Sequence, residues 1–170
     1  EAARVVAWVS LKKKDYKKSK DYLDKAYKFI NNDRITLIIA ETLKQYLYVF
    51  EKNKFPDTKN NFGEFSLINQ VFQKCYLKDE NIKTNFETLI NNINSKDYSR
   101  YIFFYISYLV QNNSYKKAKL ITDDLDYLSS SLLVSQGKKW IEDKQLKKFQ
   151  KIFSCKNSSD IIGELFFLVA

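Results

Sequence analysis

The scarcity of turn-forming residues is the feature that most narrows what this chain can fold into. Its 170 residues include only three glycines and one proline, and the hairpin dipeptides Asn-Gly and Asp-Gly do not occur. Tight β-hairpins need such residues, because their favoured turns require a positive backbone φ. A β-sheet fold would therefore lack its turns, and the sequence predicts an all-α fold.

The clearest amphipathic helix lies in residues 15–30. Its apolar or small positions are Tyr16, Ser19, Leu23, Ala26 and Ile30. They are three or four residues apart, which places them on one helical face. Asp15 is suited to cap this helix, because its carboxylate can accept the free amide protons of the first turn. We predict that the helix forms an antiparallel hairpin with residues 2–13.

Helical periodicity continues along the rest of the chain. We expect a long helix at 34–50, helical pairs at 65–77 with 81–93, 97–111 with 115–128 and 132–143 with 145–153, and a last helix from residue 158. This divides the chain into residues 1–52, a hairpin plus a long unpaired helix; residues 53–63, a loop around Pro56; and residues 64–170, three further hairpins and the first helix of a truncated one.

The second helices of these pairs share a recurring motif. DYKKS at residues 15–19 aligns with SYKKA at residues 114–118 at an offset of 99 residues, three times 33. QLKKF at residues 145–149 follows 31 residues later. A period of about 31 to 34 residues corresponds to one helical hairpin per unit.

The recurrence resembles the tetratricopeptide repeat (TPR). The residues that carry the resemblance are Ala7, Tyr16, Ser19 and Ala26 in the first unit, Tyr115 and Ala118 in a later one, and Gly137 in the last. Phe149 and Ile106 stand where the pattern asks for small residues, and no unit ends in the customary proline. The resemblance implies a divergent bacterial TPR protein from an A/T-rich genome, folded as an α-solenoid of stacked antiparallel helical hairpins, a TPR-like superhelix.

Both ends of the sequence suggest a piece of a longer protein. The first residue is not methionine, and the last residues, LFFLVA, resemble the middle of an apolar helix. The longest apolar run, residues 101–110, is about half the length needed to cross a bilayer, so we expect no membrane span in this fragment. We expect a soluble protein of the cytoplasm or the periplasm, depending on the missing N-terminus.

The residue types used in most enzyme active sites are missing or isolated. The chain has no histidine, which removes the commonest general base and metal ligand. Cys75 and Cys155 are far apart and lie in apolar contexts, which favours buried free thiols. We interpret the carboxylates of Asp123, Asp124 and Asp126 as solvated helix surface, because no further ligand completes a metal site. The sequence predicts no enzyme, no metal and no cofactor.

The net charge of +9 points at first to an anionic partner such as nucleic acid. Arginine occurs only at Arg4, Arg34 and Arg100, whereas lysine, asparagine, isoleucine, tyrosine and phenylalanine are plentiful. These abundant residues share A/T-rich codons, and arginine is the preferred bidentate phosphate ligand. The composition therefore argues against a dedicated nucleic-acid surface.

The TPR resemblance implies a non-catalytic scaffold that binds a protein or peptide in the concave groove of the solenoid, lined by the first helix of each hairpin. The groove positions would be Arg4, Trp8, Lys12, Gln70, Lys74, Lys78, Arg100, Phe103, Ser107, Lys138 and Ile141. This mixture of basic and apolar groups suits an acidic or amphipathic peptide. The alternatives are a helical-repeat protein that binds RNA or another single strand through its lysines, and a segment that only spaces or oligomerises other domains. The oligomeric state stays open.

Overall fold

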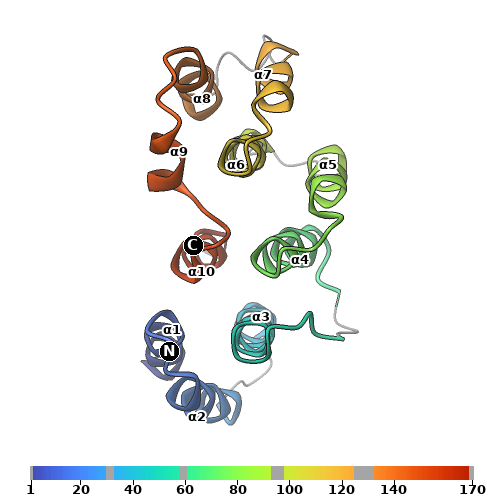
Figure 1. Ribbon diagram of the computed structural model, residues 1–170. Helices are drawn as coiled ribbons and strands as arrows, with labels where there is room; N and C mark the ends of the chain where they lie inside the picture. The colour runs from blue at the N-terminus through green and yellow to red at the C-terminus, as the bar shows by residue number, and fades with distance from the viewer. Residues whose placement is uncertain (1, 30–32, 58–60, 93–97, 125–131, 169–170) are drawn as a thin grey trace. The chain divides into compact units, whose positions relative to one another are not determined.

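A computed structural model describes residues 2–29, 33–57, 61–92, 98–124 and 132–168 (Figure 1). All regular secondary structure in these ranges is helical, which confirms the prediction of an all-α fold. The helices are α1 (Ala2–Lys12), α2 (Tyr16–Tyr27), α3 (Arg34–Lys52), α4 (Glu64–Tyr76), α5 (Ile82–Asn92), α6 (Tyr98–Gln111), α7 (Tyr115–Asp124), α8 (Leu132–Glu142), α9 (Lys147–Ile152) and α10 (Ser158–Phe167).

The helices belong to two compact units. Unit 1 comprises Glu1–Asp79 and Ser158–Ala170, and therefore contains α1 to α4 and α10. Unit 2 comprises Glu80–Asn157 and contains α5 to α9. Because α4 and α5 belong to different units, the expected hairpin between them stays a prediction, as does the division of the chain at residues 53–63.

The packing of α1 against α2 begins unit 1. Asp15 caps α2 as predicted, since its side chain accepts a hydrogen bond from the amide of Lys18 at 3.1 Å. The face that α2 turns inward contains Ser19, Leu23 and Ala26, all buried. These three positions confirm the middle of the predicted face, whereas Tyr16 is half-buried and Ile30 lies outside the described residues.

The long helix α3 packs against α1, α2 and α4. Asp33 begins it by accepting a hydrogen bond from the amide of Ile35 at 3.1 Å, and Asn53 ends it in the left-handed region with φ 51°. The sequence left this helix unpaired because its residues fit no register of the repeat. In the structure it has three neighbours, and its buried side chains form much of the core of unit 1.

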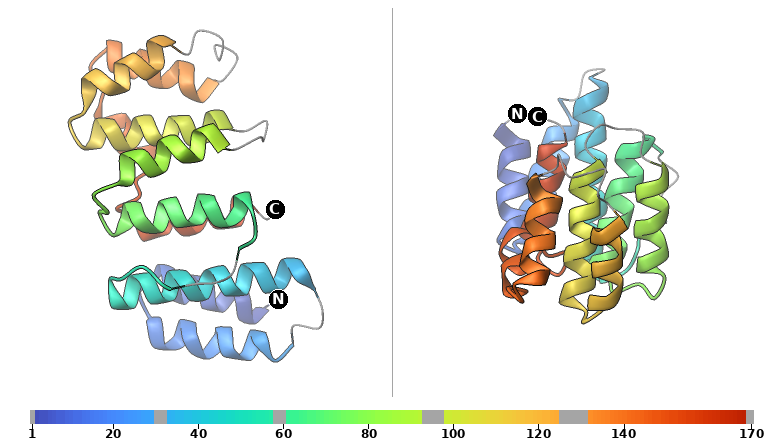
Figure 2. Two further views of the ribbon diagram at one scale, coloured as in Figure 1. Left: turned by 90° about the vertical axis from the view of Figure 1, so that its right-hand side faces the viewer. Right: turned by 90° about the horizontal axis from the view of Figure 1, so that it is seen from above.

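The last helix of the chain completes unit 1. Helix α10 packs against α1 and α4 (Figure 1), and the rings of Trp8 and Phe166 lie with their centroids 5.0 Å apart. The sequence predicted α10 to begin a truncated hairpin, but within this unit its partners are the first and the fourth helix. The spatial order of helices in unit 1 therefore differs from their order along the chain (Figure 2).

Unit 2 is built around α6, which packs against α5, α7, α8 and α9. Phe103, Phe104 and Tyr105 are buried and belong to the core of this unit. The ring of Phe103 stacks on that of Phe149 with centroids 5.7 Å apart, and the ring of Phe104 stacks on that of Phe153 at 3.9 Å. Aromatic stacking thus joins α6 to the region of α9.

The prediction of free thiols was wrong. Cys75 and Cys155 are both buried, as expected, but both are disulfide-bonded. The apolar sequence contexts of both cysteines correctly indicated burial, but burial does not distinguish a free thiol from a disulfide. Separately, every helix in the described ranges is too short or too polar to span a bilayer.

Candidate functional site

The eleven predicted groove residues are divided between the two units. Helices α1 and α4, with a residue two positions after the end of α4, contribute Arg4, Trp8, Lys12, Gln70, Lys74 and Lys78 in unit 1. Helices α6 and α8 contribute Arg100, Phe103, Ser107, Lys138 and Ile141 in unit 2. The side chain of Arg4 lies outside the described part of the structure.

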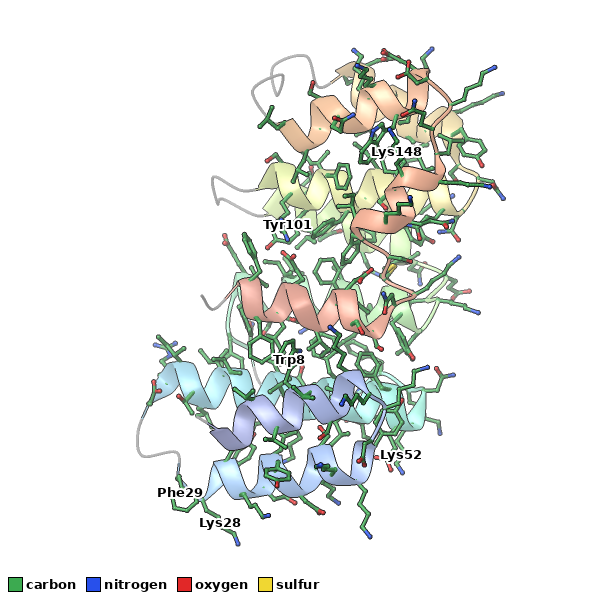
Figure 3. All side chains as sticks on the ribbon, turned by 90° about the vertical axis from the view of Figure 1, so that its left-hand side faces the viewer. Trp8, Lys28, Phe29, Lys52, Tyr101 and Lys148 are labelled. Atoms are coloured by element: carbon green, nitrogen blue, oxygen red, sulfur yellow. The ribbon has the colours of Figure 1, made fainter. Side chains whose placement is uncertain are left out.

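In unit 1, the predicted residues pack mainly against neighbouring aromatic rings. Trp8 lies on the side of α1 that faces α10 (Figure 3), and the ammonium group of Lys12 lies 5.8 Å from its ring centroid. The ammonium group of Lys74 lies 5.4 Å from the ring of Phe55. Of the two further predicted positions, Gln70 is half-buried within α4, and Lys78 is exposed just after it. Cation–π contacts of this kind fix the lysine side chains on the surface.

In unit 2, two of the predicted residues are core residues. Phe103 and Ser107 have no exposed surface, and the hydroxyl of Ser107 donates a hydrogen bond to the carbonyl oxygen of Phe153 at 3.0 Å. They therefore have no surface with which to contact a partner, because other helices enclose the middle of α6 on several sides. Their prediction as groove residues was therefore wrong.

The other predicted residues of unit 2 lie nearer the surface. The guanidinium of Arg100 lies 5.0 Å from the ring centroid of Phe104. Lys138 forms an ion pair with Asp123 at 3.7 Å, and Ile141 is half-buried. The exposed ion pair contributes little to stability, so Lys138 can exchange its partner.

An open cleft of about 430 Å³ lies between α2 and α3 of unit 1. Its lining residues are Tyr16, Lys17, Lys20, Leu23, Asp24, Lys44, Leu47, Tyr48, Glu51 and Lys52. None of them belongs to the predicted groove. Only the spacing of Tyr16 and Leu23 on α2 indicated this region in the sequence, because it marks the edge of the buried face of that helix. The residues of α3 match no repeat, so the sequence did not indicate them as part of a binding site.

The floor of the cleft is apolar. Leu23 and Leu47 reach it with only 2% and 5% of their surface exposed, whereas the ring of Tyr48 is 41% exposed on the wall. Burial raises the pKa of the Tyr16 phenol, and the nearby Tyr76 and Glu51 raise it further. Tyr16 is therefore neutral near pH 7 and offers a ring face and a hydroxyl rather than a charge.

Lysine ammonium groups dominate the rim. Lys17 and Lys20 have no ion-pair partner among the residues that the structure describes. Lys52 pairs with the adjacent Glu51 at 3.2 Å, and both side chains are exposed. Four lysines and two carboxylates line the cleft, so its net charge is +2. Such a surface attracts anionic groups.

A hydrogen bond between the two walls holds the cleft at one end. The hydroxyl of Tyr27 on α2 donates to a carboxylate oxygen of Glu41 on α3. Burial, followed by this hydrogen bond to Glu41, raises the pKa of Tyr27 far above its ordinary value. The ammonium group of Lys44 lies over the same ring, 5.1 Å from its centroid. The spacing of α2 and α3 is therefore fixed before any ligand binds.

The chemistry available in the cleft is that of binding. It offers apolar surface, two phenol hydroxyl groups and several ammonium groups that can accept anionic ligands. Within the described ranges, no group of three or more histidine, cysteine, aspartate or glutamate residues is arranged to hold a metal ion.

Comparison with protein-family models, curated proteins and solved structures gave no match to this chain.

Proposed function

We propose that this chain is a non-catalytic protein-interaction module that binds a peptide or protein partner in a groove between helices. The α2–α3 cleft is the observation that carries the proposal. It combines an apolar floor with a cationic rim on two helices that are already fixed relative to each other. Rigid helical walls of this kind lower the entropy cost of binding, because little of the site must be ordered by the ligand.

We further propose that the helices are stacked as a TPR-like solenoid. The first hairpin supports this, because Ala7, Ser19 and Ala26 are all buried at positions that the repeat pattern reserves for small residues. In unit 2, Ala118 is also buried, and Gly137 lies against the rings of Phe103 and Phe149. Small residues at these positions let neighbouring helices approach closely.

A peptide suits the cleft better than a nucleic acid does. Asp24 on one wall and Glu51 on the other place carboxylates beside the lysines. A continuous phosphate backbone would meet these carboxylates at unfavourable distances, whereas a peptide presents discrete charges that can avoid them. We therefore expect RNA to bind this cleft more weakly than an acidic peptide does.

The test uses fluorescence anisotropy with the full chain and labelled probes: short acidic, neutral and basic peptides that contain apolar residues, and a single-stranded RNA. We expect the acidic peptides to bind and to remain bound at moderate salt. Binding of RNA alone, with an affinity that falls by about a thousandfold or more over a fourfold rise in salt, would contradict the proposal.

Two charge-reversal variants decide where the peptide binds. Lys20→Glu with Lys44→Glu changes the rim of the cleft, whereas Lys74→Glu with Lys138→Glu changes two positions of the groove predicted from the sequence. We expect only the first pair to weaken binding. Lys116→Glu with Lys119→Glu, on the exposed face of α7, is the matched control for a general loss of positive charge.

A further inference from the structure

We infer that the α2–α3 cleft selects a peptide segment in which one large apolar side chain lies between two carboxylates. This inference rests on the proposed function and specifies the ligand that the same site would take. It follows from the order in which charged and aromatic residues are placed along the two walls of the cleft.

The wall formed by α3 presents an alternating row. Lys44, Tyr48 and Lys52 are separated by four residues each, so they lie on one face of the helix. At 1.5 Å per residue, the two lysines begin about 12 Å apart along the helix axis, with the exposed ring of Tyr48 midway between them. A ligand that matches this row carries negative charge at both ends and an apolar group at its centre.

The wall formed by α2 contributes Lys17 and Lys20 near its start and the carboxylate of Asp24 one turn further on. The two helices run antiparallel, and Lys52 and Lys28 mark opposite ends of the pair (Figure 3). The start of α2, with Lys17, therefore lies near the end of α3, with Lys52. Within the described residues, Lys17 and Lys20 have no ion-pair partner, and they add positive charge at the Lys52 end of the cleft.

The centre of the cleft accommodates an apolar side chain. Leu23 and Leu47 close its floor, and the ring of Tyr16 adds a half-buried wall. The volume of about 430 Å³ is at the lower end of the range for ligand pockets. A single phenylalanine or leucine side chain is therefore the group that enters.

The distance between Lys44 and Lys52 along α3 matches an extended ligand. An extended peptide rises by about 3.3 Å per residue, so carboxylates about 12 Å apart are roughly four residues apart in its sequence. The apolar residue then lies between them. The exposed ion pair between Lys52 and Glu51 does not oppose this, because such pairs are weak and exchange readily.

Charge complementarity makes an acidic peptide a better occupant than a second copy of the chain. The cleft has a net charge of +2 and the chain a net charge of +9, so two copies repel each other overall. An acidic segment gains from the same field. The occupant is therefore a foreign acidic peptide with an apolar anchor.

The test measures binding of the full chain to a set of matched peptides. The reference peptide carries two glutamates four residues apart with a phenylalanine between them. One variant replaces the phenylalanine by alanine, and two others replace either glutamate by glutamine. A last variant keeps the composition but places both glutamates on the same side of the phenylalanine. We expect the reference peptide to bind about tenfold or more tightly than each of the others.

Variants of the chain assign this preference to the cleft. Tyr48→Ala is expected to abolish the preference for phenylalanine, and Lys44→Gln is expected to abolish the penalty for losing one of the two glutamates. Both side chains are exposed, and helix content and thermal unfolding check that the variants fold. Lys116→Gln on α7 is the control and should bind as the unchanged chain does.

The outcomes separate this inference from the proposed function. Equal affinity for the reference peptide and the peptide with both glutamates on one side overturns the inference, but leaves peptide binding in place. A preference that survives Tyr48→Ala and Lys44→Gln overturns the assignment to this cleft. Failure of every peptide in both panels, with RNA bound instead, overturns the proposed function itself.

Discussion

The hydroxyl of Ser19 donates a hydrogen bond of 2.9 Å to the carbonyl oxygen of Ala7, and both residues are buried. This bond joins α2 to α1 at the place where two small side chains let the helix backbones approach. It satisfies a polar group that would otherwise be buried without a partner. The first hairpin is therefore held both by apolar packing and by one specific polar contact.

Replacement of Ser19 should reveal both parts of this contact. Ser19→Ala removes the hydrogen bond and keeps the space, so we expect a loss of about 1 kcal/mol in the free energy of unfolding. Ser19→Leu also forces the helices apart and should cost about 1–3 kcal/mol more. Urea unfolding of the full chain measures both. Ser135→Ala, at an exposed position of α8, should change little; equal effects at both serines would contradict the packing described.

The carboxylate of Glu87 makes unit 2 sensitive to acid. It accepts hydrogen bonds from Lys117 and, at 2.8 Å, from the hydroxyl of Tyr105. The bond from Lys117 is the main cause that lowers the pKa of Glu87 from its ordinary value of 4.5; burial opposes the shift and Tyr105 adds to it. Because the folded state lowers this pKa, the stabilisation is present above the ordinary value and is lost as the pH falls through the lowered one.

We therefore expect Glu87→Gln to lower stability near neutral pH and to lose this effect in acid. Both partners of the ion pair are more than two-fifths exposed, so solvent screening keeps the effect below about 1 kcal/mol. The measurement is the difference in unfolding midpoint between the two proteins as the pH falls. A difference that stays constant below about pH 4 would show that Glu87 is not the group responsible.

Gly137 in α8 can accept a methyl group. A Cβ atom there would lie 3.4 Å from the ring of Phe103 and 3.5 Å from that of Phe149, which are ordinary contact distances. Gly137→Ala should stabilise the helix by up to about 1 kcal/mol. Gly137→Leu should destabilise the chain by about 1–3 kcal/mol, because a larger side chain meets two core rings. Thermal unfolding distinguishes these results, and equal effects of both substitutions would contradict the observed packing.

The state of the cysteines can be measured directly. Cys75 and Cys155 are both disulfide-bonded. A thiol-specific reagent should therefore not label the denatured chain unless a reductant is added first. After reduction, two thiols per chain should react, since the sequence contains two cysteines. Reaction of the unreduced, denatured chain would support the free thiols that the sequence suggested.

The sequence predicted helices better than it predicted their neighbours. Residue spacing located α2 and α3 closely, and Asp15 caps α2 as predicted, because a cap acts within one helical turn. The packing of α10 on α1 could not be predicted, because the contact of Trp8 with Phe166 joins residues at opposite ends of the chain and leaves no periodic signal.

The candidate site was predicted less well than the fold. The resemblance to a repeat directed attention to the first helices, and it placed Phe103 and Ser107 in a groove although both are buried. The cleft instead uses the outer edge of α2 and a helix that fits no repeat. The sequence pattern does not distinguish Lys44 and Tyr48 from other surface residues, because they line a site only together with residues of α2 such as Lys20.

Mapping of the bound peptide by nuclear magnetic resonance tests the central claim most directly. The full, isotopically labelled chain is titrated with the peptide that carries phenylalanine between two glutamates, and the backbone amide signals are followed. We predict that the largest shifts fall on residues of α2 and α3 around Lys20, Leu47 and Tyr48. Shifts confined to α4, α6 and α8, or no shifts at a peptide concentration that saturates binding, would contradict the assignment of the α2–α3 cleft as the binding site.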